Sequence, residues 1–347
     1  MYSKKVANVG GLLIGGDNPV RVQTMYDSSI VGVDADSIIN KIASLSAMGC
    51  DLIRFSFVSK DDEPVFRTIC SKSVMPIVAD IHFDYRMAML ALDCGADKIR
   101  INPGNIGAKW KTGEIVRKAS DMGAAIRIGL NTGSLPKHED DKSDVAVMVD
   151  SALEYISDFE NLGFYNTVVS LKSSDIGKTL EANRRFASLS DYPIHLGVTE
   201  AGSAIISSVR STWALGHLLD EHIGDTIRVS INGSIDDEVL SATEILRTLG
   251  LKKSGVRIVA CPRCGRHTFD SHGFLMRVQS RLLAIDKDIS VAIMGCTVNG
   301  PGEAKGADFA VTGYGKKIFL YKNGENFAKV DSPEEAERIL FDEIDGI

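Results

Sequence analysis

Three cysteines near the end of the chain have the residue type and spacing of metal ligands. Cys261 and Cys264 form a Cys-x-x-Cys turn, and Cys296 follows 32 residues later in a segment rich in glycine and proline. Six cysteines in 347 residues are too few for a fold stapled by disulfides, so this pair is better interpreted as metal-binding or redox-active. The pattern therefore predicts a bound metal ion or metal cluster.

Two kinds of metal centre fit these thiols. A structural zinc ion would take His267 or His272 as its fourth ligand, and Cys-x-x-Cys is a common zinc half-site. Zinc sites usually add a second closely spaced pair, however, whereas here one cysteine stands with Glu303 at the far end of its loop. An iron-sulfur cluster with three thiolates and one oxygen ligand would keep one iron open to substrate. The Cys-x3-Cys-x2-Cys spacing of adenosylmethionine radical enzymes is absent, which favours direct electron delivery if the centre is iron-sulfur.

The elements before residue 250 repeat one pattern, in which a helix ends at a glycine and a strand begins directly after it. Glycine suits this C-cap position because it adopts positive φ; the glycines are Gly49, Gly95, Gly123, Gly163 and Gly224. Strands are predicted at 20–25, 51–57, 76–80, 97–101, 124–129, 166–171, 193–198 and 225–230. These βα units predict an α/β fold, a (β/α)8 barrel of the TIM type, whose catalytic face is formed by the carboxyl ends of its strands. Cys50, Cys70 and Cys94 lie within these elements and are interpreted as small buried side chains.

Polar residues gather at the predicted carboxyl ends of the strands. Five are cations on different strands: Arg54, Arg100, Arg127, Lys172 and Arg228. One such residue alone could be a solvated surface side chain. Five on one face of a protein with a net charge of -7 instead predict a ligand with two phosphates, because Arg binds paired oxygens and Lys acts as a point charge. The same ends carry Asn102, Asn131, Thr199 and Ser230 as further candidates for substrate binding.

Three more residues at these ends are candidates for catalysis. Glu200 has apolar neighbours in the segment Gly197–Gly202, a setting that would favour a protonated carboxyl group and general acid catalysis. A salt bridge to one of the arginines is the alternative. His82 is either an acid–base group or a structural hydrogen-bonding residue, and Asp80 is placed with it at the end of the third strand.

The composition disfavours several classes of partner. A net charge of -7 argues against nucleic acid and against an anionic membrane, since both select a basic surface. Residues 1–5 are not followed by an apolar signal segment, and no apolar run of about 18 residues occurs. We therefore expect a soluble, cytoplasmic protein.

The pattern of elements changes after residue 250 and predicts a second domain. Lys252–Gly255 reads as a short polar linker. The segments that follow predict a small α+β domain, with strands at 256–260, 290–294, 307–311, 317–321 and 326–330, a helix at 270–285 and a final helix from Pro333. We expect domains at 1–250 and 251–347, with residues 1–19 forming a hairpin lid over one end of the barrel.

Seven motifs resemble those of the 4-hydroxy-3-methylbut-2-enyl diphosphate synthase family in its short bacterial form. They are Ala79–Arg86, Arg100–Gly107, Arg127–Leu135, Val198–Gly202, Gly224–Ser230, Ala260–Cys264 and Gly295–Glu303, so the resemblance covers nearly the whole chain. It implies a 4Fe-4S cluster held by Cys261, Cys264, Cys296 and Glu303. It also implies reductive ring opening of 2-C-methyl-D-erythritol 2,4-cyclodiphosphate in isoprenoid biosynthesis by the methylerythritol phosphate pathway, with electrons from ferredoxin or flavodoxin.

The resemblance also assigns roles at the mouth of the barrel. It implies that Glu200 is the acid–base group and that the diphosphate is bound by Arg54, Arg100, Asn102, Arg127, Asn131, Lys172, Arg228 and Ser230. The chain departs from the family at Tyr26 and Asp27, where the family has Thr followed by Asn or Thr. A pterin-dependent barrel transferase with a structural zinc knuckle is the alternative, since it would share a phosphate-binding mouth.

The length of the last barrel helix indicates an oligomer. A helix of about 14 residues after the eighth strand would descend ~20 Å from the catalytic face, and a linker of about six residues spans at most ~20 Å. The cysteines are therefore not expected to reach the mouth of their own barrel. We expect a head-to-tail homodimer in which the metal centre of one subunit acts at the mouth of the other.

Overall fold

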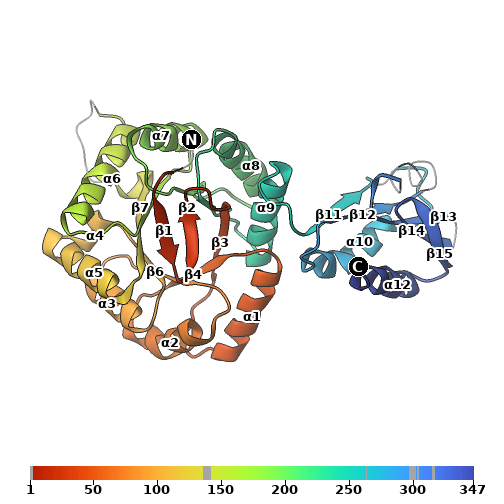
Figure 1. Cartoon of the computed structure of the whole chain (residues 1–347), viewed down its shortest axis with the longest axis horizontal. Coiled ribbons are helices and arrows are strands. Elements are labelled where there is room, and N and C mark those ends of the chain that lie inside the picture. Colours follow the sequence, from red (N-terminus) through yellow and green to blue (C-terminus); the bar gives the residue numbers. More distant parts are fainter. Residues whose placement is uncertain (1–2, 136–141, 263, 297–301, 303–304, 315–316) are drawn as a thin grey trace. The chain divides into compact units, whose positions relative to one another are not determined.

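The structure is a computed structural model of the chain, and it describes residues 3–135, 142–262, 264–296, 302, 305–314 and 317–347. Glu303, predicted as a cluster ligand, lies outside these residues. The chain forms two compact units, Met1–Lys252 and Lys253–Ile347 (Figure 1).

The first unit is a barrel of eight parallel strands. Its strands, in the order β8-β7-β6-β5-β4-β3-β10-β9, are β3 (Arg21–Met25), β4 (Leu52–Ser56), β5 (Ile77–Asp80), β6 (Lys98–Ile101), β7 (Ala125–Asn131), β8 (Thr167–Lys172), β9 (His195–Leu196) and β10 (Thr226–Ile227). A parallel bridge between Val169 and Ile194 links β8 to β9 and closes the ring. The predicted α/β barrel is thereby confirmed.

Two strands are shorter than the sequence predicted. The segments 193–198 and 225–230 contain only the two-residue strands β9 and β10. The pairing continues one step farther, because Arg228 N donates to Leu196 O at 3.0 Å. The residues beyond β9 and β10 therefore already belong to the loops at the mouth.

The helices of the barrel surround the strands on the outside (Figure 1). They are α1 (Ala35–Ala47), α2 (Glu63–Lys72), α3 (Tyr85–Asp93), α4 (Pro103–Ile106), α5 (Lys109–Met122), α6 (Asp144–Asn161), α7 (Ile176–Leu189), α8 (Ala204–Asp220) and α9 (Ile235–Thr248), with 3-10 turns η1 (Lys60–Asp62) and η2 (Thr132–Ser134). Asp34 shows how they start, since its side chain accepts from Asp36 N and Ser37 N.

The predicted glycine caps are present where the helices end. Gly49, Gly95, Gly123, Gly163 and Gly224 all have positive φ, between 67° and 119°. A residue with a side chain rarely adopts this conformation, so glycine allows each helix to stop and the chain to turn into the next strand. The repeat inferred from the sequence therefore marks the points at which the barrel helices end and the next strands begin.

A hairpin of β1 (Val6–Val9) and β2 (Leu12–Gly15) closes the amino-terminal end of the barrel. Its apolar side chains pack against the first inward-facing residues of the strands; the cluster is Ala7, Val9, Ile14, Leu52, Val78, Ala125 and Val168. Asn166, beside the start of β8, binds both backbone groups of Asn8 through its side-chain amide, at 2.8 and 2.9 Å. The polar carboxyl ends of the strands lie at the opposite end.

The second unit contains one five-stranded sheet. Its strands β11 (Val256–Ala260), β12 (Ile289–Met294), β13 (Phe309–Tyr314), β14 (Lys317–Lys322) and β15 (Glu325–Val330) follow one another in the sheet, the first three parallel and the rest antiparallel. The helices α10 (Ser271–Leu283) and α12 (Pro333–Asp345) share its apolar core, through residues such as Phe274 and Leu340.

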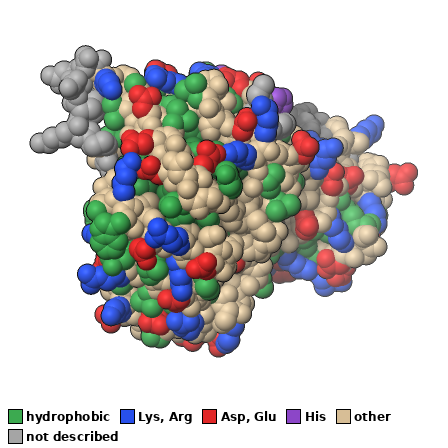
Figure 2. All heavy atoms as spheres, turned by 60° about the vertical axis from the view of Figure 1, so that its left-hand side comes forward, with side chains coloured by type: hydrophobic (Ala, Val, Ile, Leu, Met, Phe, Trp, Pro, Cys, Tyr) green, Lys and Arg blue, Asp and Glu red, His purple; other side chains and the backbone are tan. Residues whose placement is uncertain are grey.

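The surface of the described residues shows two further properties. Lysine and arginine side chains are interspersed with aspartate and glutamate on the face shown in Figure 2. Within the described ranges, no helix has both the length and the apolar character needed to cross a lipid bilayer.

Candidate functional site

Strand register brings the predicted binding residues into the barrel. Asp80 on β5 pairs with Arg100 on β6, which pairs in turn with Arg127 on β7. Directly paired residues of a sheet point to the same face, so these side chains enter the interior together. Six cationic residues are buried or nearly so there: Arg54, Lys98, Arg100, Arg127, Lys172 and Arg228. Five of them are the cations predicted from the sequence.

Two carboxylates pair with these cations among the described residues. Arg100 Nη1 donates to Asp80 Oδ1 at 3.4 Å, and Arg54 Nε lies 3.8 Å from Asp80 Oδ2. Glu238, in the first turn of α9, accepts from Arg228 Nη2 at 2.8 Å and Nε at 3.1 Å. Burial alone would raise the pKa of Asp80, but the surrounding cations, Arg54 first among them, lower it below its usual value. Six positive charges thus face two negative ones.

Several polar atoms below the mouth have no hydrogen-bond partner among the described residues. They are Nε and Nη1 of Arg127, Nζ of Lys98 and both amide atoms of Gln23. Arg127 is 1% exposed and Lys98 is fully buried. Burial, then the nearby arginines, lower the pKa values of both cations well below their usual range. Unpaired buried cations are costly, so this arrangement indicates a site built for an anion.

Lys172 is held in a different way from the arginines. Its Nζ lies 3.1 Å from His195 Nε2, and the other ring nitrogen, Nδ1, is hydrogen-bonded to Thr226 Oγ1. The lysine side chain passes over Gly197, where an added Cβ would lie 2.7 Å from Nζ. Burial, and then Lys172, lower the pKa of His195 well below its usual value, so the ring is neutral.

The remaining predicted residues lie at the rim. Asn102 is buried and its side chain accepts from Gly104 N at 3.2 Å, which caps α4. Asn131 is the last residue of β7 and pairs with Lys172. Thr199 N donates to Ser173 O at 3.1 Å, and Ser230 O accepts from Ser207 Oγ at 2.6 Å. These contacts fix the loops that follow the strands.

The two candidate acid–base residues are exposed. His82 Nδ1 lies 4.0 Å from Asp80 Oδ2, with the imidazole open to solvent. Glu200 is exposed and has a φ of 53°, in the left-handed region that residues with side chains seldom adopt. The apolar surroundings expected for Glu200 are absent, since Glu200 is exposed whereas its neighbours Val198 and Ala201 are buried. Strained backbone of this kind is common at functional loops.

The mouth contains a cavity of about 410 Å³ on the side of β3 and β4. Arg228 and Glu238 line it, together with Tyr26 and Asp27, the two positions at which the chain departs from the family motif. The ring of Tyr26 packs on Phe55 at a centroid distance of 5.1 Å. The departure therefore lies at the edge of the mouth, beside the cation that Glu238 already neutralises.

The predicted metal ligands of the second unit follow two neighbouring parallel strands. Cys261 comes directly after β11 and Cys296 two residues after β12, and Gly295 N donates to Cys261 Sγ at 3.1 Å. Cys264 is exposed and Cys296 is buried. Within the described ranges, no three side chains of His, Cys, Asp or Glu lie together as a metal site. Strand register thus brings Cys261 and Cys296 to one edge of the sheet.

The two histidines proposed for zinc lie near the same edge. His267 Nδ1 is hydrogen-bonded to the backbone oxygen of Cys264 at 2.7 Å, and His272 lines a cavity of about 270 Å³ together with Cys261.

The cysteines of the barrel are not suited to bind a metal. Burial raises the pKa of the Cys50 thiol to about 12 and the pKa of the Cys70 thiol above its usual value. Thiols of that kind remain protonated and are poor metal ligands.

Five interior residues escaped the sequence analysis. Lys98 lies two residues before Arg100 and therefore on the same face of β6, a spacing that could have revealed it. His195 and Gly197 share one face of the ninth strand region in the same way. Glu238 resembles an ordinary acid in the first turn of a helix. Gln23 gave no signal, because it lies in a strand with other polar side chains, Arg21 and Thr24, and has no distinctive spacing.

Comparison with known families gives two matches that cover most of the chain. Residues 3–243 match the GcpE TIM-barrel domain, and residues 257–345 match the GcpE protein C-terminal domain. Proteins named 4-hydroxy-3-methylbut-2-en-1-yl diphosphate synthase (flavodoxin) are similar over nearly their full length. The protein of Treponema pallidum is 43% identical, covering 92% of this chain and 82% of its own, and that of Caldicellulosiruptor saccharolyticus is 43% identical, covering 97% of both. These matches confirm the resemblance that the motifs indicated.

Solved structures of dihydropteroate synthases share the barrel. The Yersinia pestis enzyme has a TM-score of 0.51 at 12% identity, covering 71% of this chain and 97% of its own. The Xanthomonas albilineans enzyme with 4-aminobenzoic acid has a TM-score of 0.51 at 16% identity, covering 71% and 96%. At such identities the likeness concerns the fold alone, so it gives no support to the pterin-dependent alternative.

Proposed function

The chain belongs to the GcpE family, and from that premise we propose that it converts 2-C-methyl-D-erythritol 2,4-cyclodiphosphate to 4-hydroxy-3-methylbut-2-enyl diphosphate. In this reaction the bond between C2 and its phosphate oxygen breaks, the C3 hydroxyl leaves as water and a C2=C3 double bond forms. Two electrons and one proton convert the dianionic substrate to a trianionic product and water. The negative charge on the diphosphate therefore increases during turnover.

The excess of positive charge in the barrel is the observation that carries this proposal. Six cations face two carboxylates, which leaves positive charge for an anionic ligand. A cyclic diphosphate offers two phosphoryl groups, and arginine binds such oxygens through paired N–H donors. The strands fix the positive charges of the barrel before the ligand arrives. These charges would therefore stabilise the negative charge that develops on the diphosphate when the ring opens.

The residues at the mouth then divide by role. Arg54, Arg100, Arg127, Lys172 and Arg228 would hold the phosphoryl oxygens, with Asn102, Asn131, Thr199 and Ser230 fixing the ligand at the rim. Glu200 is placed to deliver the proton that lets the C3 hydroxyl leave as water, because it lies on the exposed turn after β9. Asp80 would orient Arg54 and Arg100 from the end of β5, with His82 beside its carboxylate as a further candidate for catalysis.

We propose that Cys261, Cys264, Cys296 and Glu303 hold a 4Fe-4S cluster. The thiols fit this group, since three cysteines with an oxygen donor leave one iron exchangeable, and the Gly295 N–H supplies the kind of sulfur hydrogen bond that tunes cluster potentials. When bound, the cluster would supply the two electrons. Flavodoxin is the proposed donor to it, because the relatives carry flavodoxin in their names, with ferredoxin as the alternative.

Anaerobic purification with metal analysis and a turnover assay tests these proposals together. We expect iron and sulfide in a ratio that fits one 4Fe-4S cluster, broad iron-sulfur absorption, and conversion of the cyclodiphosphate by the reduced protein. A colourless protein with one zinc and neither iron nor sulfide would overturn the cluster assignment. Iron-sulfur protein that binds no cyclodiphosphate would overturn the substrate.

We also propose that the protein works as a head-to-tail homodimer. The last residues of the barrel unit lie at its amino-terminal end, because Lys252 Nζ donates to Gly49 O at 3.1 Å, just before β4. Three residues, 253–255, then lead to β11 and span at most ~10 Å. The polar mouth is at the other end of the barrel, so the cysteines of one copy are proposed to serve the mouth of a second.

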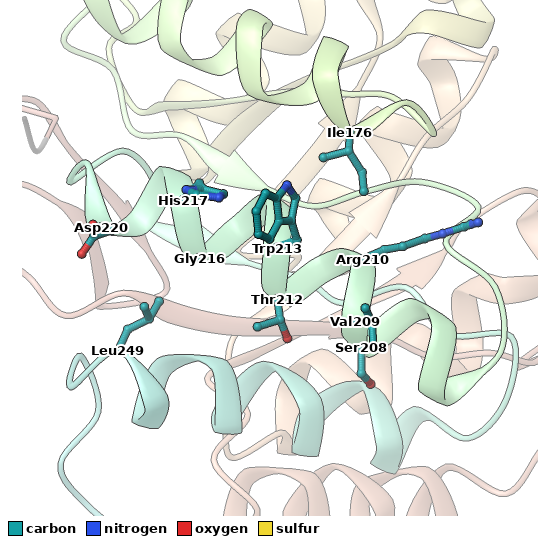
Figure 3. Close-up of a pocket in the computed structure, with 10 residues that line it drawn as sticks. All are labelled: Ile176, Ser208, Val209, Arg210, Thr212, Trp213, Gly216, His217, Asp220 and Leu249. Carbon is teal, nitrogen blue, oxygen red and sulfur yellow. The ribbon is translucent and has the colours of Figure 1, made fainter.

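The outer face of α8 supports a contact between two copies. Four large apolar side chains are exposed along it: Ile205 (80%), Ile206 (49%), Val209 (66%) and Trp213 (60%). Beside them lies a cavity of about 780 Å³ lined mostly by residues of α8, such as Gly216 and His217, and by Leu249 at the end of α9; Figure 3 shows the Trp213 ring on the side of α8 toward Ile176. Neighbouring exposed apolar side chains of this kind are typical of an interface, in which each partner of a stable dimer contributes about 800 Å².

A second copy suits this face because the face is nearly neutral. Arg210 and Asp220 are its only residues of full charge, with opposite signs, so two α8 helices related by a twofold axis would not repel each other. The protruding Ile205 and Val209 of one copy would fill the hollow beside Trp213 of the other. Other barrel helices carry ion pairs on their outer faces, for example Lys109 with Glu154.

Two measurements test the dimer. Trp213→Asp should give monomers by analytical ultracentrifugation with the cluster retained and turnover lost, whereas Trp110→Asp, at an equally exposed tryptophan on α5, should leave the dimer intact. A mixture of Arg127→Met chains with Cys264→Ser chains should regain turnover that neither has alone. A monomeric parent protein with full activity at high dilution would contradict the proposal.

A further inference from the structure

Lys172 is the one mouth cation whose observed partner is an imidazole. Arg54, Arg100 and Arg228 have carboxylates beside them, but no carboxylate of the described residues pairs with Lys172. Its Nζ lies 3.1 Å from His195 Nε2 instead; His195 is fully buried and Lys172 is 7% exposed. The difference matters, because a carboxylate partner cancels a cation's charge, whereas a neutral imidazole directs the cation without cancelling it.

The chain builds this contact from three strands. Lys172 ends β8, His195 begins β9 and Thr226 begins β10. Gly197 clears the path, since a Cβ there would lie 2.7 Å from Nζ and 2.8 Å from the Arg228 oxygen. Because the ammonium group can only donate, His195 Nε2 must accept, and the ring proton must lie on Nδ1, where Thr226 Oγ1 receives it.

We propose that His195, with its tautomer fixed by Thr226, is a positioning residue that keeps Lys172 protonated and aimed at the diphosphate. This inference rests on the proposed function of the mouth. The charged groups that act most strongly on Lys172 from other elements are cations: Arg127 from β7, Arg54 from β4, Arg228 after β10 and Arg100 from β6. Burial and these neighbours lower the pKa of Lys172 well below its usual value, so the acceptor lone pair of His195 opposes that loss of the proton.

Matched substitutions at position 195 separate positioning from packing. His195→Leu removes the acceptor, whereas His195→Gln keeps one in its amide oxygen. We expect His195→Leu to weaken binding of the cyclodiphosphate by roughly tenfold to a hundredfold, the usual effect of a hydrogen bond to a charged group. We expect His195→Gln to recover most of that loss. Thr226→Val should show a smaller loss and Thr226→Ser almost none, because serine keeps the hydroxyl group.

The pH profile of binding is the readout that a purely structural role would not move. The anion binds the ammonium form of Lys172, so affinity is full below the pKa of Lys172 and falls as pH rises through it. In His195→Leu and Thr226→Val that fall should begin at a lower pH than in the parent and in the two conservative variants. Arg127 and Lys98 also act on His195, so a shift is assigned to Lys172 only where His195→Leu and Thr226→Val, which leaves the ring of His195 in place, both show it.

Two ligands make the outcomes distinct. Titrations use the cyclodiphosphate and, separately, inorganic diphosphate, which probes the cation without depending on the identity of the substrate. A parent protein that binds only inorganic diphosphate contradicts the proposed function and leaves the role of His195 testable. Profiles for His195→Leu that coincide with those of the parent, or a His195→Gln variant that behaves like His195→Leu, overturn the inference. A pH shift confined to His195→Leu and Thr226→Val supports it.

Discussion

In the barrel, the charged groups of the site are held in place before any ligand arrives, whereas at the cysteine edge no three described ligand side chains lie together. The difference follows from the elements that carry them. Arg100 and Arg127 extend from paired strands, so backbone register fixes their positions. Cys264 and Cys296 lie in segments after strands, where no ladder fixes them. A site on strands can be formed in advance at a cost in stability, but a site on loops is completed by the metal that it binds.

Removing one cluster ligand should have the largest effect and should show that the two regions are separable. Cys264→Ser is expected to abolish iron-sulfur absorption and turnover, because a cluster needs its thiolates. Cyclodiphosphate binding, measured by calorimetry, should remain within about threefold of the parent, since the barrel is unchanged. Cys70→Ser, at a half-buried barrel cysteine, is the control that keeps both the cluster and turnover. Lost substrate binding in Cys264→Ser would show that the barrel site depends on the metal.

Glu200 tests whether the exposed turn of the barrel adds chemistry to the preformed charge. Glu200→Ala should keep the cluster and substrate binding and should lower turnover by roughly 10²- to 10⁴-fold, the usual contribution of general acid catalysis. Single-turnover kinetics of the reduced protein gives the rate. Glu221→Ala, at an exposed glutamate outside the mouth, provides the control. Ordinary turnover in Glu200→Ala would refute the acid–base role.

Lys98 tests the cost of holding charge in place. Lys98→Met replaces a fully buried ammonium without a described partner by an apolar side chain of similar length. We expect the free energy of unfolding to rise by about 1–3 kcal/mol, as when buried charges are replaced by apolar groups, and diphosphate affinity to fall. Urea denaturation of the parent and the variant measures the first effect. Lys178→Met, at an exposed lysine, should change neither quantity. A destabilised Lys98→Met barrel would mean that the ammonium has an unseen partner.

Acid should weaken the barrel slightly through Asp80. The neighbouring cations lower the pKa of Asp80 by more than burial raises it. The pKa in the folded protein is therefore below the unfolded value of about 3.9. The sign follows from linkage: the ionised carboxylate contributes stability above about pH 4, and this contribution is lost as pH falls through the folded pKa. Urea midpoints of the parent and Asp80→Asn, measured at pH 7 and again at acid pH, should therefore differ most at pH 7. An equal difference at both pH values would contradict this reasoning.

The sequence was informative wherever one local pattern determines position. Glycine caps and apolar strands predicted the barrel, and the ends of the strands predicted the five mouth cations. Lys98 and His195 were missed because each lies at the start of a strand and not at its carboxyl end. At such a position, a site residue differs from a surface residue only in whether its side chain points into the barrel. The exposure of Glu200 was not predictable, since it depends on a left-handed turn that the apolar neighbours of Glu200 do not reveal.

The hairpin of β1 and β2 closes the amino-terminal end of the barrel and leaves it open at one end only. With β1 and β2 packed against the first residues of the strands, small molecules have to enter and leave through the polar mouth. Substrate and product must therefore pass through the same opening, so product has to leave before the next substrate can bind.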